Sequence, residues 1–154
     1  MGETEILAKY IVNSKYRDFP KEVIEKTKER IGDIIACGLG GRKTLEGDTL
    51  IAVMKSLGGK PQATVIGDKT RLSFMQAAQV NRVLTNMLDY DDDYTNICHM
   101  STALVPVALA IGEWINASGK DIIHAFVLGC EVVTRLRAAV NPSVDVFWKT
   151  FERI

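Results

Sequence analysis

Two long apolar segments with the periodicity of an α-helix dominate the second half of the sequence. Residues 103–115 are apolar on almost every side, and residues 120–140 carry a broad apolar face. A helix of this kind is stable in water only when other helices cover it. The sequence therefore predicts a helical bundle, and its excess of apolar surface leads us to expect a chain that is part of something larger or that self-associates.

Shorter segments of the first half repeat apolar residues at the same 3.6-residue spacing. They predict further helices over residues 3–15, 20–39, 48–57 and 74–88. Between Pro61 and Gly67 the chain is rich in residues that favour strands, which predicts a short extended piece. The expected fold is all-α, a single multi-helix domain over residues 1–154 with at most one short extended segment near residues 63–66.

Small polar residues mark where these helices are expected to begin. Asp48 and Ser73 are the expected N-caps of two helices, because their side-chain oxygens can accept from free backbone N–H groups. Ser101 or Thr102 is expected to cap the most apolar helix. Pro106 then falls in its first turn, where a missing N–H has little effect.

Several residues inside the expected helices have structural interpretations. Gly32 and Gly38 lower the local helix propensity, and close packing between helices is the usual reason for such glycines. Asn81 and Asn86 are interpreted as exposed or as capping a neighbouring segment. His124 is interpreted as structural or exposed, because no acidic, cysteine or histidine partner lies at the spacing of metal ligands.

The composition excludes several classes of partner. The chain has 154 residues, 47% of them hydrophobic, and a formal net charge of zero, so no electrostatic attraction to nucleic acid or to a membrane surface is expected. Three well-separated cysteines, Cys37, Cys98 and Cys130, do not have the spacing expected of a zinc or disulfide framework. We expect Cys37 and Cys130 to be small buried residues. The acidic N-terminus lacks a signal-peptide core, so the sequence predicts a cytoplasmic protein.

Four carboxylates, Asp89, Asp91, Asp92 and Asp93, lie within five positions between two apolar helices, and His99 follows them. We call residues 89–93 the acidic loop. Like charges at this density repel one another unless the loop is solvated or binds a positive group. Composition leaves two interpretations open, a solvated interhelix loop or a pocket floor where carboxylate and imidazole meet a substrate.

The residues of the acidic loop suggest three kinds of chemistry. An EF-hand needs glycine at its sixth position and glutamate at its twelfth, where this sequence has Tyr94 and Met100, so calcium is rejected. A magnesium-diphosphate site needs a second acidic cluster, which does not follow here. The third alternative is general acid–base work by Asp89 and His99 on a small anionic acid, because nearby carboxylates favour the charged imidazole; residue types alone do not decide between this alternative and the magnesium site.

The order and spacing of several motifs resemble one known family. The match covers the region from about Glu5 to Pro142. Its first motifs are Ala77-Ala78-Gln79-Val80-Asn81, Leu88-Asp89-Tyr90-Asp91-Asp92 and His99. The later motifs are Pro106, Ala108, Leu109, Ala110 and Glu113 on one helix, then Ser118-Gly119, and finally Gly129, Glu131-Val132 and Arg135-Leu136. In these motifs the chain is similar to the N-terminal part of the MmgE/PrpD family, which includes 2-methylcitrate dehydratase, cis-aconitate decarboxylase and iminodisuccinate epimerase.

The resemblance implies a helical domain and a lyase or isomerase, above all a hydro-lyase like 2-methylcitrate dehydratase, that acts on di- or tricarboxylic acids. It implies no cofactor and no metal. By residue, it implies catalytic roles for His99, as the proton carrier, and Asp89, which orients the histidine or contacts the substrate. It implies substrate contacts at Asp92 and Asp93. The expected partners are a small carboxylate substrate and either a second copy of the chain, as in a homodimer, or a missing C-terminal portion.

Departures from the family pattern lead to an alternative. Asp93 stands where the family usually has threonine, Met100 replaces a proline, and Cys130 replaces a tyrosine. Family members are also considerably longer and carry further pocket residues and a smaller α+β domain. The sequence therefore leads us to expect an incomplete domain that is inactive alone, and the alternative is a degenerate, non-catalytic helical module for interaction or oligomerisation.

Overall fold

The computed structural model describes residues 2–93 and 99–140. Its elements are, in order, α1 (Glu3–Asn13), the short 3₁₀ helix η1 (Tyr16–Asp18), α2 (Lys21–Gly41), α3 (Leu45–Ser56), β1 (Ala63–Thr64), β2 (Arg71–Leu72), α4 (Phe74–Asn86), α5 (Met100–Ile115) and α6 (Gly119–Val140). The predicted all-α fold class is confirmed. The extended segment near residues 63–66 is present as β1, and it pairs with a second strand, β2, that the sequence did not reveal.

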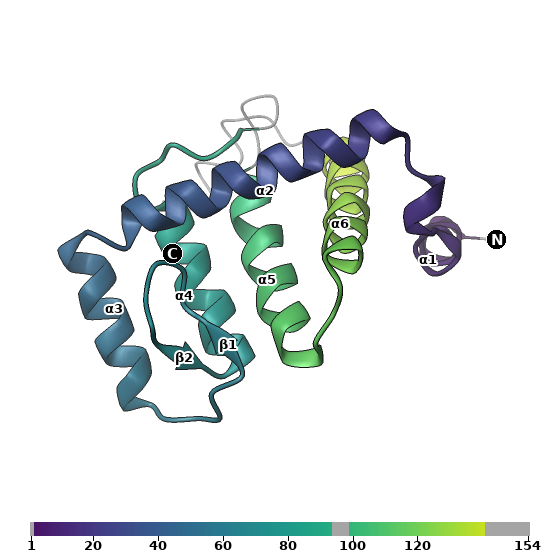
Figure 1. Cartoon of the computed structure of the whole chain (residues 1–154). Helices are drawn as coiled ribbons and strands as arrows, with labels where there is room; N and C mark the ends of the chain where they lie inside the picture. Colours follow the sequence, from purple (N-terminus) through teal and green to yellow (C-terminus); the bar gives the residue numbers. More distant parts are fainter. Residues whose placement is uncertain (1, 94–98, 141–154) are drawn as a thin grey trace.

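The helices form a row that one long helix crosses. Figure 1 shows α2 running across α4, α5 and α6, with α3 beside α4 at one end and α1 beyond α6 at the other. One buried cluster lies around α4 and includes Val65, Val80 and Leu84. A second cluster joins three of the helices through Ile34, Val105 and Phe126. The second cluster therefore holds α2 against α5 and α6, while the first joins α3, β1, β2, α4 and α5.

Close approach between α2 and α4 depends on small residues. A Cβ added to Gly41 would lie 2.1 Å from the carbonyl oxygen of Leu84, and one added to Gly38 would lie 3.2 Å from the Thr85 side chain; both partners are on α4. The packing predicted for Gly38 is thus confirmed. The same prediction for Gly32 is wrong, since a Cβ there would meet nothing within 4 Å.

Two helix starts differ from the sequence-based expectation. α3 begins earlier than expected, because Thr44 rather than Asp48 caps it and accepts a hydrogen bond from the Gly47 N–H at 3.0 Å. Asp48 instead accepts from Arg42. The expected cap Ser73 of α4 is confirmed, since its hydroxyl accepts from the N–H of Gln76.

The start of α5 is the larger correction. Neither Ser101 nor Thr102 is its cap, because the helix begins at Met100 with His99 in the N-cap position. Both hydroxyls are buried and donate elsewhere, Ser101 to Asp92 and Thr102 to the carbonyl of His99. Pro106 is consequently the seventh residue of the helix, beyond its first turn.

The β1–β2 hairpin is attached to α4 by a buried side chain. Asn81 is 2% exposed; its Oδ1 accepts from the Ile66 N–H at 2.8 Å and its Nδ2 donates to the Thr64 carbonyl at 3.0 Å. The expectation that Asn81 is exposed is therefore wrong, whereas the alternative, that it caps a neighbouring segment, is confirmed. Buried backbone polar groups need such partners, because the hairpin is too short to satisfy them itself.

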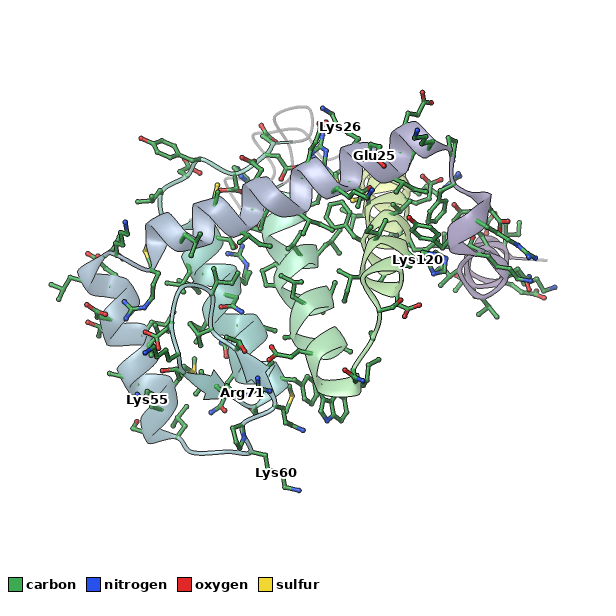
Figure 2. The ribbon with its side chains drawn as sticks, in the orientation of Figure 1. Glu25, Lys26, Lys55, Lys60, Arg71 and Lys120 are labelled. Carbon is green, nitrogen blue, oxygen red and sulfur yellow. The ribbon has the colours of Figure 1, made fainter. Side chains whose placement is uncertain are left out.

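Charged side chains lie on the outer surfaces. Figure 2 shows Glu25 and Lys26 on the outward face of α2, and Lys60 pointing away from the loop after α3. Cys37 and Cys130 are half-buried rather than fully buried, and Cys98 lies outside the described residues. In the part of the chain that the structure describes, no helix combines the length and the apolar character that crossing a membrane requires.

Candidate functional site

The acidic loop leaves the end of α4 through an unusual backbone conformation. Asp89 has a φ of 53°, in the left-handed region that few residues other than glycine, asparagine and aspartate adopt. Its N–H donates to the carbonyl of Asn86, the last residue of α4, at 3.0 Å. The turn directs the following aspartates toward the start of α5.

Asp91 and His99 form the central contact of the site. The Nδ1 atom of His99 lies 2.7 Å from Oδ2 of Asp91, whose side chain is completely buried. The other oxygen of Asp91 accepts from Nδ2 of Asn86 at 3.0 Å. The imidazole itself is 44% exposed, so one edge of the ring is held by the protein while solvent or a ligand can reach the remainder.

Asp92 is held by a second set of contacts. Its Oδ2 accepts a hydrogen bond from the Ser101 hydroxyl at 2.7 Å, and Arg30 of α2 forms an ion pair with the same oxygen. Its Oδ1 is buried and has no hydrogen-bond partner among the described residues. Asp93 is exposed, and Tyr94 lies outside the described residues.

The local surroundings explain how the loop tolerates its carboxylates. The N-terminus of α5 is positively polarised, so it favours negative groups nearby. Arg30 adds a full charge, and Ser101 and Asn86 supply hydrogen-bond donors. The pKa of His99 is raised, chiefly by the hydrogen bond to Asp91 and further by the charges of Asp91, Asp93 and Asp89, although burial opposes the shift. The imidazolium is therefore favoured by its immediate neighbours.

The thiol of Cys37 is a poor nucleophile. Cys37 lies on α2, and burial raises the pKa of its thiol, with further contributions from Asp33 and Asp91. Thiolates rather than thiols react as nucleophiles. The acid–base groups of the acidic loop are thus better suited to proton transfer than to covalent catalysis through this cysteine.

The structure brings together only some of the residues that the sequence indicated. Asp89 lies near His99, but the residue that contacts the imidazole is Asp91. Asp92 is tied to protein groups, and Asp93 is exposed. Sequence reasoning missed Asn86, Arg30 and the role of Asp91. The dense aspartates were a signal for Asp91, whereas no local pattern joins Arg30 to Asp92, 62 residues away.

Asp89, Asp91 and His99 could each offer one atom to a metal ion, and these atoms lie within 4.8 Å of one another. The direct contact between Asp91 and His99 accounts for two of the three groups without an ion. Exposed acidic groups often gather in loops for reasons of solvation alone. The geometry therefore supports a hydrogen-bonded acid–base pair, and the cluster by itself does not define a metal centre.

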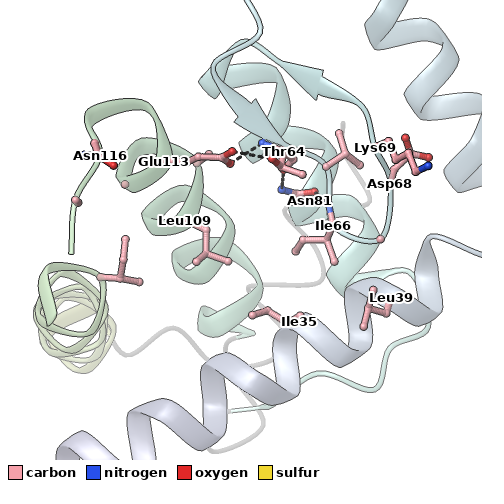
Figure 3. Close-up of a pocket in the computed structure, with 16 residues that line it drawn as sticks. Ile35, Leu39, Thr64, Ile66, Asp68, Lys69, Asn81, Leu109, Glu113 and Asn116 are labelled. Carbon is pink, nitrogen blue, oxygen red and sulfur yellow. Dashed lines mark hydrogen bonds between the residues drawn. The ribbon is translucent and has the colours of Figure 1, made fainter. Parts of the chain in front are cut away.

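A large cavity lies away from the acidic loop. It has a volume of about 700 Å³ and opens between α2, the hairpin, α5 and the start of α6. Figure 3 shows Glu113 reaching across it to Thr64, whose N–H and hydroxyl each donate at 2.7 Å. Glu113 also pairs with Arg71. These polar groups satisfy one another and join α5 to the hairpin, which gives Glu113 a structural role.

The fold and the site define a class: an all-helical domain in which a carboxylate and an imidazole meet where two helix ends converge. Comparison with protein families identifies it further. The family model described as "MmgE/PrpD N-terminal domain" matches residues 5–151, so the chain belongs to this family.

Characterised relatives extend the comparison. The human cis-aconitate decarboxylase is 32% identical over 148 residues, which cover 93% of this chain and 31% of that protein. The mouse cis-aconitate decarboxylase is 31% identical over 93% of this chain and 30% of its own length. The cis-aconitate decarboxylase of Aspergillus terreus is 26% identical over 92% of this chain and 30% of its own length. The chain thus spans less than a third of these relatives.

Proposed function

We propose that this chain supplies the acidic loop and the neighbouring His99 as acid–base groups of a lyase that acts on a di- or tricarboxylic acid. One observation carries the proposal: His99 is held against the buried Asp91 at 2.7 Å while its ring remains 44% exposed. A general acid needs both a fixed orientation and access to its substrate. The similarity to cis-aconitate decarboxylases makes decarboxylation of cis-aconitate the first reaction to test.

The chemistry suits a protonated imidazole. Decarboxylation breaks a carbon–carbon bond, CO₂ departs, and the electron pair left on the substrate is quenched when a proton is added to carbon. His99 is the proton donor in this proposal, because its neighbours raise its pKa and so favour the charged form. In this proposal Asp89 contacts the substrate, either directly or through a water molecule. The dehydration of 2-methylcitrate, which the sequence suggested, would use the same acid to assist loss of hydroxide.

The substrate carboxylates require further cations. Arg30, the arginine that contacts the acidic loop, is already paired with Asp92. A di- or tricarboxylate is normally held by several charge-assisted hydrogen bonds. The buried Oδ1 of Asp92, which has no partner among the described residues, leaves an acceptor for an additional group. We therefore propose that the remaining substrate contacts come from the part of the family fold that lies beyond the matched region.

The alternative function is a non-catalytic module that assembles with a second copy. Two observations favour it. Asp93 adds an exposed negative charge where an anionic substrate would approach. Several apolar side chains of α5 and α6 are also exposed, namely Val107, Ile111, Trp114, Ile115 and Leu136.

The deciding experiment assays the protein isolated from its host. We would supply cis-aconitate and, separately, 2-methylcitrate, and would follow substrate loss and CO₂ release by NMR and gas analysis. His99→Asn is expected to lower turnover by at least about 100-fold, the typical contribution of a general acid. His124→Asn is the matched control, because His124 packs against Phe19 and lies on α6.

Each outcome discriminates between the two functions. If the unmodified protein converts the substrate and the His99→Asn variant converts it at the same rate, His99 has no part in the mechanism. Failure of the unmodified protein to convert either acid would favour the non-catalytic module. Circular dichroism of both variants distinguishes a lost acid from a lost fold.

A further inference from the structure

The two nitrogens of His99 have different surroundings. Nδ1 lies 2.7 Å from Oδ2 of Asp91, and this carboxylate is completely buried. An ionised carboxylate can only accept hydrogen bonds, so the nitrogen that contacts it must carry a proton. In a neutral imidazole the other nitrogen, Nε2, is then bare and able to accept a proton.

Asn86 fixes the orientation of Asp91. Its Nδ2 donates to Oδ1 of Asp91 at 3.0 Å, which leaves Oδ2 to face the histidine. Asn86 is the last residue of α4, and His99 immediately precedes α5. The three side chains therefore connect two helix ends, and each oxygen of the buried carboxylate receives one donor.

From this arrangement we infer that Asp91 is a positioning residue, oriented by Asn86, that keeps the Nδ1 proton of His99 facing the protein and leaves Nε2 as the nitrogen that exchanges protons with a ligand. The inference rests on the proposed function for what the exchange accomplishes. Asp89 does not have this role, since the contact that holds the ring is made by Asp91. The raised pKa of His99, for which the Asp91 hydrogen bond is the largest cause, agrees with this geometry.

The inference predicts the effect of the isosteric change Asp91→Asn. The oxygen of the new amide would continue to accept from Asn86, so its NH₂ group would face Nδ1 of His99. A nitrogen that accepts from NH₂ cannot carry a proton in the neutral ring. The tautomer of His99 should therefore invert, from a proton on Nδ1 to a proton on Nε2.

Exchanging the two groups should reverse the inversion. In the double variant Asn86→Asp with Asp91→Asn, the carboxylate stands on α4 and accepts from the new NH₂ group. The amide oxygen then turns toward His99 and again accepts from a protonated Nδ1. The double variant has the same net charge as the unmodified chain, so a restored tautomer would depend on the direction of the hydrogen bonds and not on charge.

The experiment records ¹⁵N spectra of the histidine rings in the full chain, above the pH at which His99 becomes neutral. The sequence has only two histidines, and His124 serves as an internal reference in every sample. Asp93→Asn is the matched control, because it removes one negative charge from the same loop, and Asp93 also favours the charged His99. We expect the Nδ1–H form in the unmodified chain, in Asp93→Asn and in the double variant, and the Nε2–H form in Asp91→Asn.

Two results would overturn the inference. One is a proton on Nε2 in the unmodified chain, a measurement that needs no variant and so is unaffected by any loss of folding. The other is a folded Asp91→Asn chain whose tautomer equals that of the unmodified chain. The ¹⁵N measurement contains no substrate, so it tests the tautomer independently of catalysis. If the tautomers are as expected but the protein shows no turnover, the proposed function is rejected and the inference about Asp91 stands.

Discussion

Replacing Asn81 with alanine tests how the hairpin is held to the bundle. The substitution removes the acceptor of the Ile66 N–H and the donor to the Thr64 carbonyl, both supplied by a side chain that is 2% exposed. Leaving a buried polar group without a partner costs about 1–3 kcal/mol. Thr64 is exposed, so water can partly replace its lost donor. We therefore expect a loss of about 2–4 kcal/mol in the free energy of unfolding.

Urea unfolding followed by circular dichroism measures this loss. With a slope of about 2 kcal/mol per molar urea, the midpoint should fall by roughly 1–2 M. Gln79→Ala is the control, because Gln79 is exposed on the same helix. A substitution at such a surface position usually changes stability by no more than about 0.5 kcal/mol.

Hydrogen exchange locates the effect. The Ile66 amide, which donates to Asn81, should lose its protection in Asn81→Ala, whereas amides inside α2 should lose only what the global destabilisation requires. The reasoning would be refuted by an Asn81→Ala midpoint equal to that of Gln79→Ala together with a still-protected Ile66 amide.

Two further predictions follow from the same structure. In α2, Gly41→Ala should destabilise the fold by at least about 2 kcal/mol, because its Cβ would lie 2.1 Å from the Leu84 oxygen. Gly32→Ala should instead stabilise the fold by about 0.5–1 kcal/mol, because its Cβ would meet nothing within 4 Å. Equal urea midpoints for the two variants would contradict this description of the packing. His99 has a raised pKa in the folded chain, so its stabilising effect is complete below its unfolded pKa of about 6.5 and is lost as the pH rises through the folded value. Asp91→Asn should flatten this fall in stability, and an unchanged slope would show that another group causes it.

Local patterns in the sequence predicted most of the helices, because the spacing of apolar residues shows which face of a helix is buried and does not depend on which element covers that face. They placed the beginning of α5 wrongly, since Ser101 and Thr102 have the chemistry of caps but are buried inside the helix. A capping residue is recognised by its hydroxyl, and the sequence does not show whether that hydroxyl meets a free N–H or a distant carboxylate. In Ser101 it meets Asp92.

The sequence by itself determined the all-α fold, the family, and the presence of an acidic loop followed by a histidine, because these depend on residue type and on spacing along the chain. The tertiary structure decided which carboxylate holds His99, why Asn81 is buried, and that Arg30 pairs with Asp92. Such pairings depend on the direction in which a side chain leaves the backbone. A left-handed turn at Asp89 and the crossing of α2 over α4 and α5 set these directions, and neither can be deduced from local periodicity.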